Sequence, residues 1–390
     1  MRQWRTAVFG TGFMGRVHLE GIRRLGAVQV QAIAHPDVDK AQRLAAHFPA
    51  KRVEADYREV LADPELDAVH ICTPNALHFP MAMEALAAGK HVLCEKPLTT
   101  STADARALVD AAARAGLRNC LCHNLRYYPM VQQMRCLRET GELGEILVVQ
   151  GTYSQDWLLY DTDWNWRVDS AIGGPLRAMA DIGTHWFDMA EHVTGERVTS
   201  LCADLQTFHA TRKRPKGSVE TFAGKKLQPG EYDTVPIDSD DFGAVMFRMG
   251  DRARGAMTAS QVSAGCKNRL SIEIYGSKGS VAWNQERPDE LWMGNRNAPN
   301  QILIKDPSLL LPGAQSFADL PGGHSEGYDD TFKQVFRRFY ASLEDPAVAA
   351  EYPQFRDGLR QMTILDAVLE SHRSRGWAGV APFQEAVAEC

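Results

Sequence analysis

The sequence lacks the features that mark several classes of protein. No apolar run approaches the ~20 residues that span a bilayer, and the first expected strand begins within a few residues of the N-terminus, which leaves no room for a signal peptide. The formal net charge is −6, so the basic excess of a nucleic-acid-binding surface is missing. We therefore expect a cytoplasmic protein that binds neither membrane nor nucleic acid.

The eight cysteines lack the spacing of a metal site or of a disulfide framework. No C-x-x-C pair occurs, and Cys120 and Cys122 have no second pair to complete a zinc site. Several cysteines lie in apolar, strand-like runs, which favours buried reduced thiols and predicts no metal site. Internal repeats and low-complexity tracts are missing as well. The basic cluster 212–216 lies beside Pro and Gly and is typical of a solvated loop.

What is present indicates two domains, because 390 residues exceed what one core usually serves. The first third alternates apolar strand-like runs with helix-like segments, a pattern that predicts a parallel, doubly wound sheet of the α/β class. The strands are expected over 6–10, 28–34, 68–73, 91–94 and 118–122, and helices over 16–25, 76–88 and 102–115.

After about residue 124 the pattern changes to successive short strands, which predicts a large, mostly antiparallel open sheet in an α+β domain. These strands are expected over 145–153, 198–207, 241–249, 253–262, 269–275 and 280–284. Helices are expected over 175–193, 325–343 and 353–373, and the Gly/Pro-rich stretches 212–236 and 285–320 are expected to be loops. We place a dinucleotide-binding domain over 1–124 and a substrate-binding and oligomerisation domain over 125–390.

A glycine motif follows the first expected strand. Gly10, Gly12 and Gly15 form G-x-G-x-x-G, with Phe13 and Met14 inside it and a helix-like stretch after it. In this strand–turn–helix context the first two glycines admit a pyrophosphate and the third packs helix on strand. The motif therefore predicts a dinucleotide site, although a lone G-x-G-x-x-G is often only a tight turn.

Two further loops follow expected strands and should reach the same edge of the sheet, where ligands bind in open α/β folds. One is Glu95-Lys96-Pro97, in which a cation held in the crevice favours deprotonation of a bound alcohol; the alternative is a solvated surface lysine. The other runs from Thr73 and Pro74 through Asn75 to His78, and there helix capping alone accounts for Asn75.

Asp181 and His185 are spaced i, i+4 within an expected helix and so share one face. A histidine beside a carboxylate in a cleft is a natural general base near neutral pH. Spacing alone equally fits a pair on a helix surface. Pro175 fits the first turn of that helix.

Aromatic and acidic residues gather between 153 and 166. Tyr153, Trp157 and Trp164 belong to this cluster, whose rings and carboxylates suit a sugar with apolar faces and many hydroxyls. An oligomer interface is enriched in the same rings, and the sequence leaves the two interpretations open.

These signatures occur in the order and spacing of the Gfo/Idh/MocA oxidoreductases, and the chain resembles that family over nearly its whole length. The resemblance implies an N-terminal Rossmann domain, a C-terminal open sheet that supports homodimers or homotetramers, and a sugar or inositol-type polyol as substrate. In the inositol-dehydrogenase branch, residues matching Lys96, Asp181 and His185 line the reacting carbon. Asn124 and Arg126 resemble the family segment beside the nicotinamide, and Arg167 resembles another active-site position.

The resemblance implies an NAD(P)-dependent dehydrogenase in which His185 takes a hydroxyl proton and Lys96 stabilises the alkoxide. It departs from the NAD-binding pattern at the end of the second strand, where His35 replaces the usual acidic residue; Asp37 tilts the prediction to NAD, with NADP as the alternative. The other functions carried by relatives are modification of a glycoside with a recycled NAD and cofactor sensing without turnover.

Overall fold

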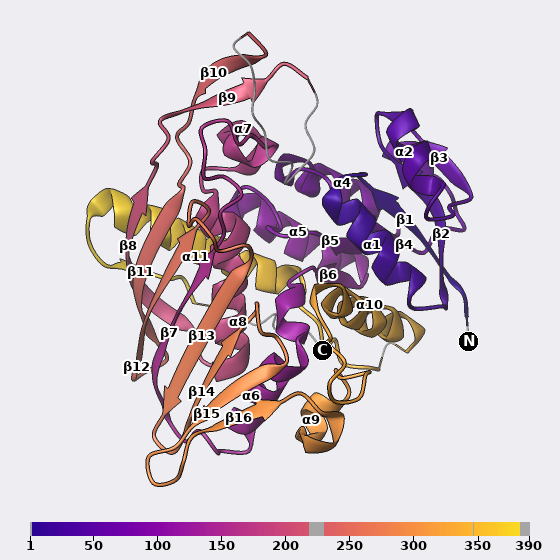
Figure 1. Ribbon diagram of the computed structural model, residues 1–390. Coiled ribbons are helices and arrows are strands. Elements are labelled where there is room, and N and C mark those ends of the chain that lie inside the picture. The colour runs from indigo at the N-terminus through magenta and orange to yellow at the C-terminus, as the bar shows by residue number, and fades with distance from the viewer. Residues whose placement is uncertain (1, 218–229, 346, 383–390) are drawn as a thin grey trace.

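The computed structural model describes residues 2–217, 230–345 and 347–382, which form two large sheets side by side with helices around them, and a separate two-stranded hairpin (Figure 1). The first is a six-stranded sheet in the order β3-β2-β1-β4-β5-β6, and every pair in it is parallel. Its strands are β1 Trp4–Phe9, β2 Val28–Ala34, β3 Arg52–Glu54, β4 Ala68–Ile71, β5 His91–Cys94 and β6 Asn119–Leu121. The predicted doubly wound parallel sheet is confirmed.

Helices cover both faces of this sheet, because successive strand side chains point to opposite faces. The helices following β1 and β2 share one apolar core, and those following β3, β4 and β5 share the other. They are α1 Phe13–Arg23, α2 Val38–Ala45, α3 Tyr57–Leu61, α4 His78–Ala87 and α5 Thr102–Ala115. The predicted helix over 102–115 has the bounds of α5, whereas α1 begins three residues before the predicted start.

The chain then crosses to the second sheet through a single turn, Asn124–Tyr127, and α6, Pro129–Glu139. This sheet has nine strands in the order β16-β15-β14-β13-β7-β12-β11-β8-β17. They are β7 Ile146–Ser154, β8 Val198–Gln206, β11 Phe242–Met249, β12 Ala253–Ser260, β13 Arg269–Gly276, β14 Ser280–Asn284, β15 Glu290–Gly294, β16 Gln301–Ile304 and β17 Ala378–Gly379. Only β7 and β12 pair in parallel, so the predicted mostly antiparallel sheet is confirmed.

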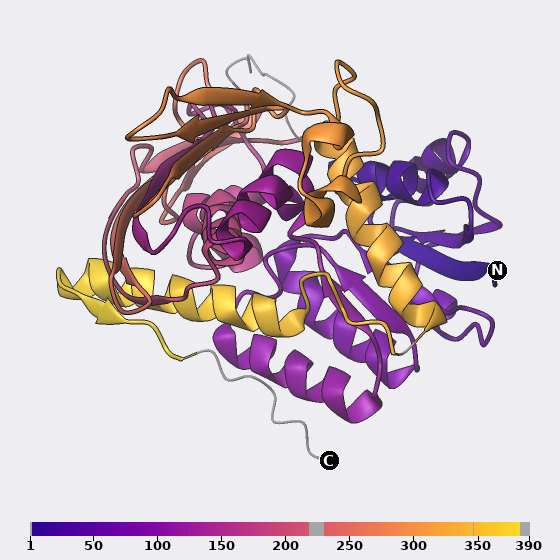
Figure 2. The same ribbon diagram turned by 90° about the horizontal axis from the view of Figure 1, so that it is seen from below.

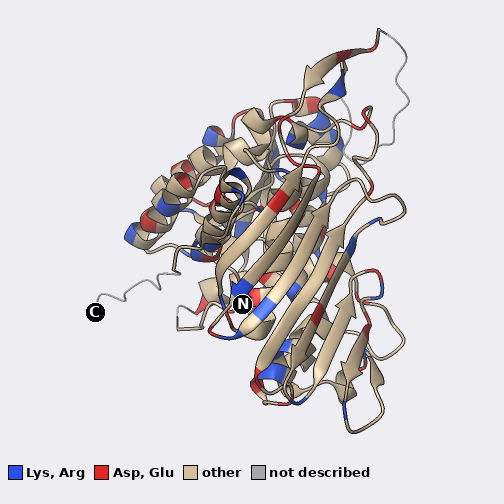
Figure 3. Cartoon of the chain, turned by 90° about the vertical axis from the view of Figure 1, so that its left-hand side faces the viewer, with Lys and Arg blue, Asp and Glu red and all other residues tan. Residues whose placement is uncertain are grey.

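One face of the nine-stranded sheet packs on α6, on α8 (Thr184–Thr194) and on α11 (Phe355–Ser374). Along β11 and β13, buried side chains on this covered face alternate with more exposed ones on the opposite face, which we call the outer face. Charges of both signs are scattered over the sheet (Figure 3). Such alternation is expected of an antiparallel sheet with one covered face.

Helix α10, Tyr328–Glu344, returns from the second sheet to pack against α1 (Figure 2). Its Phe332, Phe336 and Phe339 are buried in the core that α1 covers. A Cβ on Gly21 of α1 would lie 2.7 Å from the ring of Phe336, so the two helices approach closely. A segment remote in sequence therefore completes the first sheet's helical layer.

Two predicted loops contain strands, and the prediction is wrong there. Within 212–236 the structure has a hairpin of β9 Thr211–Pro215 and β10 Tyr232–Pro236, with residues 218–229 outside the described ones. Within 285–320 it has β15 and β16, followed by the short α9, Pro312–Gln315. Pro and Gly lie close to these strands, but strand pairing outweighs the local turn signals: β9 pairs with β10, and β15 and β16 extend one edge of the nine-stranded sheet.

The predicted helix over 175–193 starts later, which places Pro175 outside it. The described helix begins at Ala178, passes through a π-helical turn, Met179–Gly183, and continues as α8. Asp240, remote in sequence, caps this start: its carboxylate accepts hydrogen bonds from the backbone N–H groups of Arg177 (2.6 Å) and Met179 (2.9 Å). A cap of this kind leaves no local signature.

The basic cluster at 212–216 is not wholly solvated, contrary to prediction. Arg212 is fully buried, where it donates to the carbonyls of Leu158 and Tyr160 and pairs with Asp241 at 2.7 Å. Asp241 also pairs with the buried Arg177. A buried cation needs such partners, and here they join the β9–β10 hairpin to the aromatic segment around residue 160.

Candidate active site

The glycine loop joins β1 to α1 at the carboxyl edge of the parallel sheet. Gly10 has a φ of +100°, and a Cβ on Gly15 would overlap the carbonyl oxygen of Gly10. Gly12 differs, because a Cβ there would meet nothing within 4 Å. Gly12 is also the N-cap of α1, which has no side-chain cap and no acidic residue in its first turn. Two glycines thus serve the protein's own packing, while Gly12 and the open helix end form a cradle that suits a pyrophosphate.

The residues predicted around this cradle lie on either side of it. Phe13 is 44% exposed and stacks on Tyr328, with ring centroids 6.5 Å apart. His35 follows β2, and its Nδ1 accepts the backbone N–H of Asp37 at 3.0 Å. The Asp37 carboxylate accepts from the backbone of Lys40 at 2.9 Å and so caps α2. Asp37, the acidic residue on which the preference for NAD was based, therefore caps a helix.

His78 ties the two loops at the ends of β4 and β5 together. Its ring nitrogens lie 2.8 Å from the carbonyl oxygen of Pro97 and 2.9 Å from that of Thr73. Asn75 does not cap the following helix; its amide donates instead to the carbonyl of Gly173 at 2.8 Å, which links the loop to the second domain. The 73–78 loop and the Glu95-Lys96-Pro97 loop therefore lie side by side, as predicted, and the His78 ring bridges their main-chain carbonyls.

Lys96 and Asp181 form the centre of the site. Lys96 Nζ donates to the Asp181 carboxylate at 2.7 Å and to its main-chain carbonyl at 2.7 Å. Arg167 Nε lies 3.2 Å from the same carboxylate oxygen, and Gln261 donates to the other oxygen at 2.7 Å. Burial by itself raises the pKa of the Asp181 carboxyl, but the two cations outweigh it and hold that pKa well below its usual range. Asp181 is therefore an anion with one oxygen bonded to Lys96 and Arg167 and the other to Gln261.

His185 lies in the first turn of α8, 6% exposed, and its pKa is held well below 6.5 by burial and by the Lys96 cation. Neutral imidazole is the form that accepts a proton. Among the described residues, no side chain hydrogen-bonds its Nδ1. The rings of His123 (5.2 Å between centroids) and Tyr153 (6.3 Å) flank it instead. Ring packing thus orients His185, and Asp181 faces Lys96.

Asn124 and Arg126, the two residues predicted in the segment between the domains, have different partners. Asn124 is buried and donates to the hydroxyl of Thr331 on α10 at 2.7 Å. Arg126 binds Asp188 through two hydrogen bonds, at 2.6 and 2.5 Å, and Asp357 at 3.4 Å. These two carboxylates occupy the Arg126 guanidinium, so a contact with substrate stays a prediction for it.

The aromatic cluster divides into two parts. Tyr153, at the end of β7, is 3% exposed beside His185, and its hydroxyl donates to Asn268 at 2.8 Å. Trp157 and Trp164 pack on a separate small apolar cluster with Leu158. The structure therefore brings only Tyr153 of these three next to the proposed base.

Both parts of the chain match models of one protein family. A family model described as "Oxidoreductase family, NAD-binding Rossmann fold" matches residues 4–123, and the model "GFO/IDH/MocA C-terminal domain" matches residues 131–282. The crystal structure of an oxidoreductase from Sinorhizobium meliloti is 31% identical, with a TM-score of 0.79, over 97% of this chain and 99% of that one. The chain belongs to the Gfo/Idh/MocA family of oxidoreductases.

Relatives with a named activity or ligand include levoglucosan dehydrogenase. Levoglucosan dehydrogenase of Pseudarthrobacter phenanthrenivorans is 29% identical over 394 residues, which cover 97% of this chain and 99% of that protein. A solved levoglucosan dehydrogenase in complex with NADH and L-sorbose has a TM-score of 0.87 at 28% identity, over 98% of this chain and 100% of that one.

The cofactor of this family member is NAD, and the residues present fit it. The open cradle at Gly12 and the uncapped N-terminus of α1 would hold the pyrophosphate, and the 73–78 and 95–97 loops lie along the same edge of the sheet. None of the described helices has the length and apolar character needed to cross a membrane.

Three residues of the site escaped the sequence analysis. Gln261 follows β12 and His123 follows β6, and both reach the site only because their strands end there. Asp240 caps the helix that carries Asp181 from a position 59 residues later. For His123, its place after an expected strand was an available signal; for the other two, only long-range pairing reveals the contact.

Proposed function

We propose that this oxidoreductase oxidises a secondary hydroxyl of a sugar, a sugar derivative or an inositol-type polyol by hydride transfer to NAD. One observation carries the proposal: Lys96, fixed by the Asp181 carboxylate, shares a buried site with the neutral His185, at the edge of the sheet that bears the NAD cradle. The relatives named levoglucosan dehydrogenase support a cyclic sugar as the substrate class.

The chain's own residues divide the work. His185 accepts the hydroxyl proton, and Lys96 donates a hydrogen bond that stabilises the alkoxide as it forms. Asp181 keeps Lys96 in place, and Arg167 and Gln261 in turn hold the Asp181 carboxylate. Bound NAD would supply the acceptor for the hydride of the same carbon, so that loss of the proton to His185 and of the C–H electron pair leaves a C=O bond. Tyr153 and Arg167 are the side chains we propose to contact the substrate beside these groups.

A substrate screen tests the proposal directly. Levoglucosan, L-sorbose, glucose, glucose 6-phosphate and myo-inositol are each incubated with the protein and NAD or NADP, and reduced nicotinamide is followed by absorbance. We expect turnover with at least one cyclic polyhydroxy compound, faster with NAD than with NADP. Product formed without net reduced nicotinamide would instead indicate a recycled cofactor, and binding of NAD without any turnover would indicate a sensor.

We also propose that a second copy of the chain covers the outer face of the nine-stranded sheet, giving a homodimer or homotetramer. That face exposes apolar side chains on strands across its width, among them Val148 (39%), Met246 (55%) and Ile302 (60%). Large exposed apolar groups on one face are typical of an interface. Light scattering of the purified protein measures the expected mass directly.

A further inference from the structure

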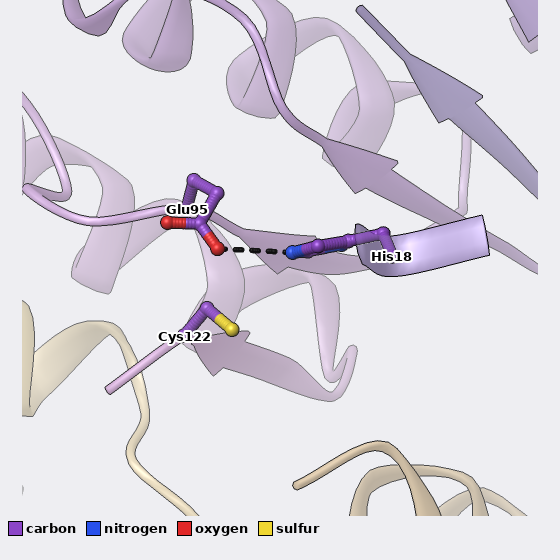
Figure 4. A group of neighbouring side chains, drawn as sticks. All are labelled: His18, Glu95 and Cys122. Carbon is purple, nitrogen blue, oxygen red and sulfur yellow. Dashed lines mark hydrogen bonds and ion pairs between the residues drawn. The ribbon is translucent and has the colours of Figure 1, made fainter. Parts of the chain in front are cut away.

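Four buried side chains form a continuous line from α10 to the lysine loop. The Tyr340 hydroxyl lies 2.9 Å from His70 Nε2, His70 Nδ1 lies 2.9 Å from His18 Nδ1, and His18 Nε2 lies 2.9 Å from Glu95 Oε1. None of the four is more than 4% exposed. Figure 4 shows the inner end of this line, where His18 reaches Glu95 beside Cys122. We call these four residues the histidine chain.

The histidine chain lies in an apolar setting. His18 packs against Phe332 and Phe336, and His70 packs against Phe336 at 4.8 Å between ring centroids. Two imidazoles in a dry core cost free energy unless their hydrogen bonds are complete, and apolar side chains of similar size avoid that cost. A task beyond packing accounts for their presence.

The direction of these hydrogen bonds follows from the tautomers when each ring carries one proton. Burial holds the pKa of His70 well below 6.5, so His70 carries one ring proton. A neutral His18 that donates from Nε2 to the Glu95 carboxylate accepts at Nδ1, so His70 donates from Nδ1. His70 Nε2 then accepts from the Tyr340 hydroxyl. Every donor in the line points towards Glu95.

Glu95 transmits this arrangement to the active site. Its second oxygen accepts the backbone N–H of Lys96 at 3.2 Å. Burial by itself raises the pKa of Glu95, but the hydrogen bond from His18 and the nearby cation of Lys96 hold it below its usual value. The Cys122 sulfur lies beside the same carboxylate, and burial keeps that thiol protonated. A protonated thiol donates a hydrogen bond to the carboxylate, so the three groups in Figure 4 form a hydrogen-bonded cluster around Glu95.

We propose that Tyr340, His70 and His18 are positioning residues for catalysis, whose one-way hydrogen bonds hold Glu95 as an anion directly behind Lys96. The inference rests on the proposed role of Lys96 in alcohol oxidation. The histidine chain links α10, which follows β16 in sequence, to the lysine loop of the first sheet. Glu95 thus lies between His18 and Lys96, and its second oxygen fixes the backbone N–H of Lys96.

The first experiment needs no substrate. In protein labelled with ¹⁵N-histidine, the ring nitrogen shifts report which nitrogen carries the proton. We expect His18 as the Nε2–H form and His70 as the Nδ1–H form at neutral pH, and Tyr340→Phe should shift His70 Nε2 because it loses its donor. A doubly protonated His18, or His70 as the Nε2–H form, reverses the direction of the chain and overturns the inference.

The second experiment separates positioning from stability. Tyr340→Phe should lower kcat about fivefold, since one neutral hydrogen bond is removed, with the Kd of NADH unchanged. Tyr352→Phe is the matched control: Tyr352 is buried in the same core, and its hydroxyl bonds Ser342 at 2.7 Å, away from the histidine chain. We expect the control to keep kcat even if its Tm falls equally. Equal kcat in the two variants overturns the inference.

A conservative pair at His18 sharpens the result. His18→Gln retains an N–H donor at the reach of Nε2 and should keep most of kcat, whereas His18→Leu should lose at least about tenfold. If both variants lose kcat equally, the donor to Glu95 is not what matters. If the wild-type protein turns over no sugar, the proposed function is contradicted. The ring-nitrogen shifts still test the direction of the hydrogen bonds in the histidine chain, because that experiment needs no substrate.

Discussion

The two large sheets differ in how many of their faces are covered by helices. The six-stranded sheet is parallel and covered on both faces, so all four residues of β4 are buried. The nine-stranded sheet has one covered face, and β11 alternates between buried Phe247 and exposed Met246. In the first sheet, a polar side chain inside a strand must find a buried partner, as His70 does. In the second sheet, a polar side chain within a strand can lie on the outer face instead.

The active site lies where these two regions meet, and each supplies a different component. The first sheet offers backbone: the glycine loop, the 73–78 loop and the loop that fixes Lys96. The second region offers side chains on a helix and a strand end: Asp181, His185 and Gln261. Binding of cofactor therefore depends on loop geometry, and chemistry depends on contacts between the domains.

The largest effect should come from removing one chemical group on each side of this boundary. Lys96→Ala and His185→Ala should each lower kcat between about a hundredfold and ten-thousandfold, the scale of acid–base groups, while the Kd of NADH stays largely unchanged. Steady-state kinetics and fluorescence titration measure the two quantities. Lys213→Ala, which removes an exposed ion pair with Asp161, is the control. Near-wild-type turnover in either variant contradicts the mechanism.

The two faces of the second sheet should differ strongly in stability. Phe247→Ala, on the covered face, should cost ~3–5 kcal/mol of the free energy of unfolding, because it leaves a cavity. Met246→Lys, one residue earlier on the outer face, should change the subunit's stability little. If a second copy covers that face, the lysine buries an unpaired charge and light scattering should show smaller species. An unchanged mass places the interface elsewhere.

The glycine loop offers a comparison within one motif. Gly15→Ala should destabilise the fold, because its Cβ overlaps the Gly10 carbonyl. Gly12→Ala should leave Tm nearly unchanged, since its Cβ meets nothing, yet weaken NADH binding about tenfold by filling the cradle. Thermal unfolding and NADH titration separate the two effects. A Gly12→Ala protein with wild-type affinity for NADH would move the pyrophosphate away from this loop.

The pH dependence should reflect burial of the base. The sequence alone favours a histidine that titrates near neutrality, but burial and Lys96 hold the pKa of His185 well below 6.5. The neutral, proton-accepting form then prevails above that lowered pKa. We expect kcat/KM to stay level from pH 9 to below 6.5 and to fall only in more acid solution. A half-loss of activity at pH 6.5, with chemistry rate-limiting, contradicts this environment for His185.

The smallest effect concerns the cap of the catalytic helix. Burial raises the pKa of Asp240 to about 6, against hydrogen bonds from Arg177 and Met179 that lower it. Between its unfolded value and pH 6 the folded protein binds the extra proton, so Asp240's contribution to stability falls as pH rises. Asp240→Asn keeps an amide oxygen for one N–H and should remove this decline. Denaturant unfolding at pH 4.5 and 6.5 measures the slope; an unchanged slope contradicts the assignment.

Predictability from sequence differed between the two regions for a physical reason. In the first region, β2 and β5 are mostly apolar runs with Pro36 and Pro97 close behind them, and α5 lies between its cap Ser101 and Gly116, so these three elements have the predicted bounds. In the second region, β15 and β16 lie in Gly/Pro-rich sequence and are held by pairing with β14, which no local signal records. The start of the helix bearing Asp181 was missed likewise, because its cap comes from Asp240.

The sequence by itself determined the dinucleotide motif, the parallel sheet and the candidates Lys96, Asp181 and His185, since each depends on residues close together in the chain. The tertiary structure alone decided what they do to one another. It turned Asp181 towards Lys96, surrounded His185 with rings that keep it neutral, and engaged Arg126 with two carboxylates. Those outcomes depend on burial and on charges brought together from distant segments, and a pKa is set by such surroundings rather than by spacing along a helix.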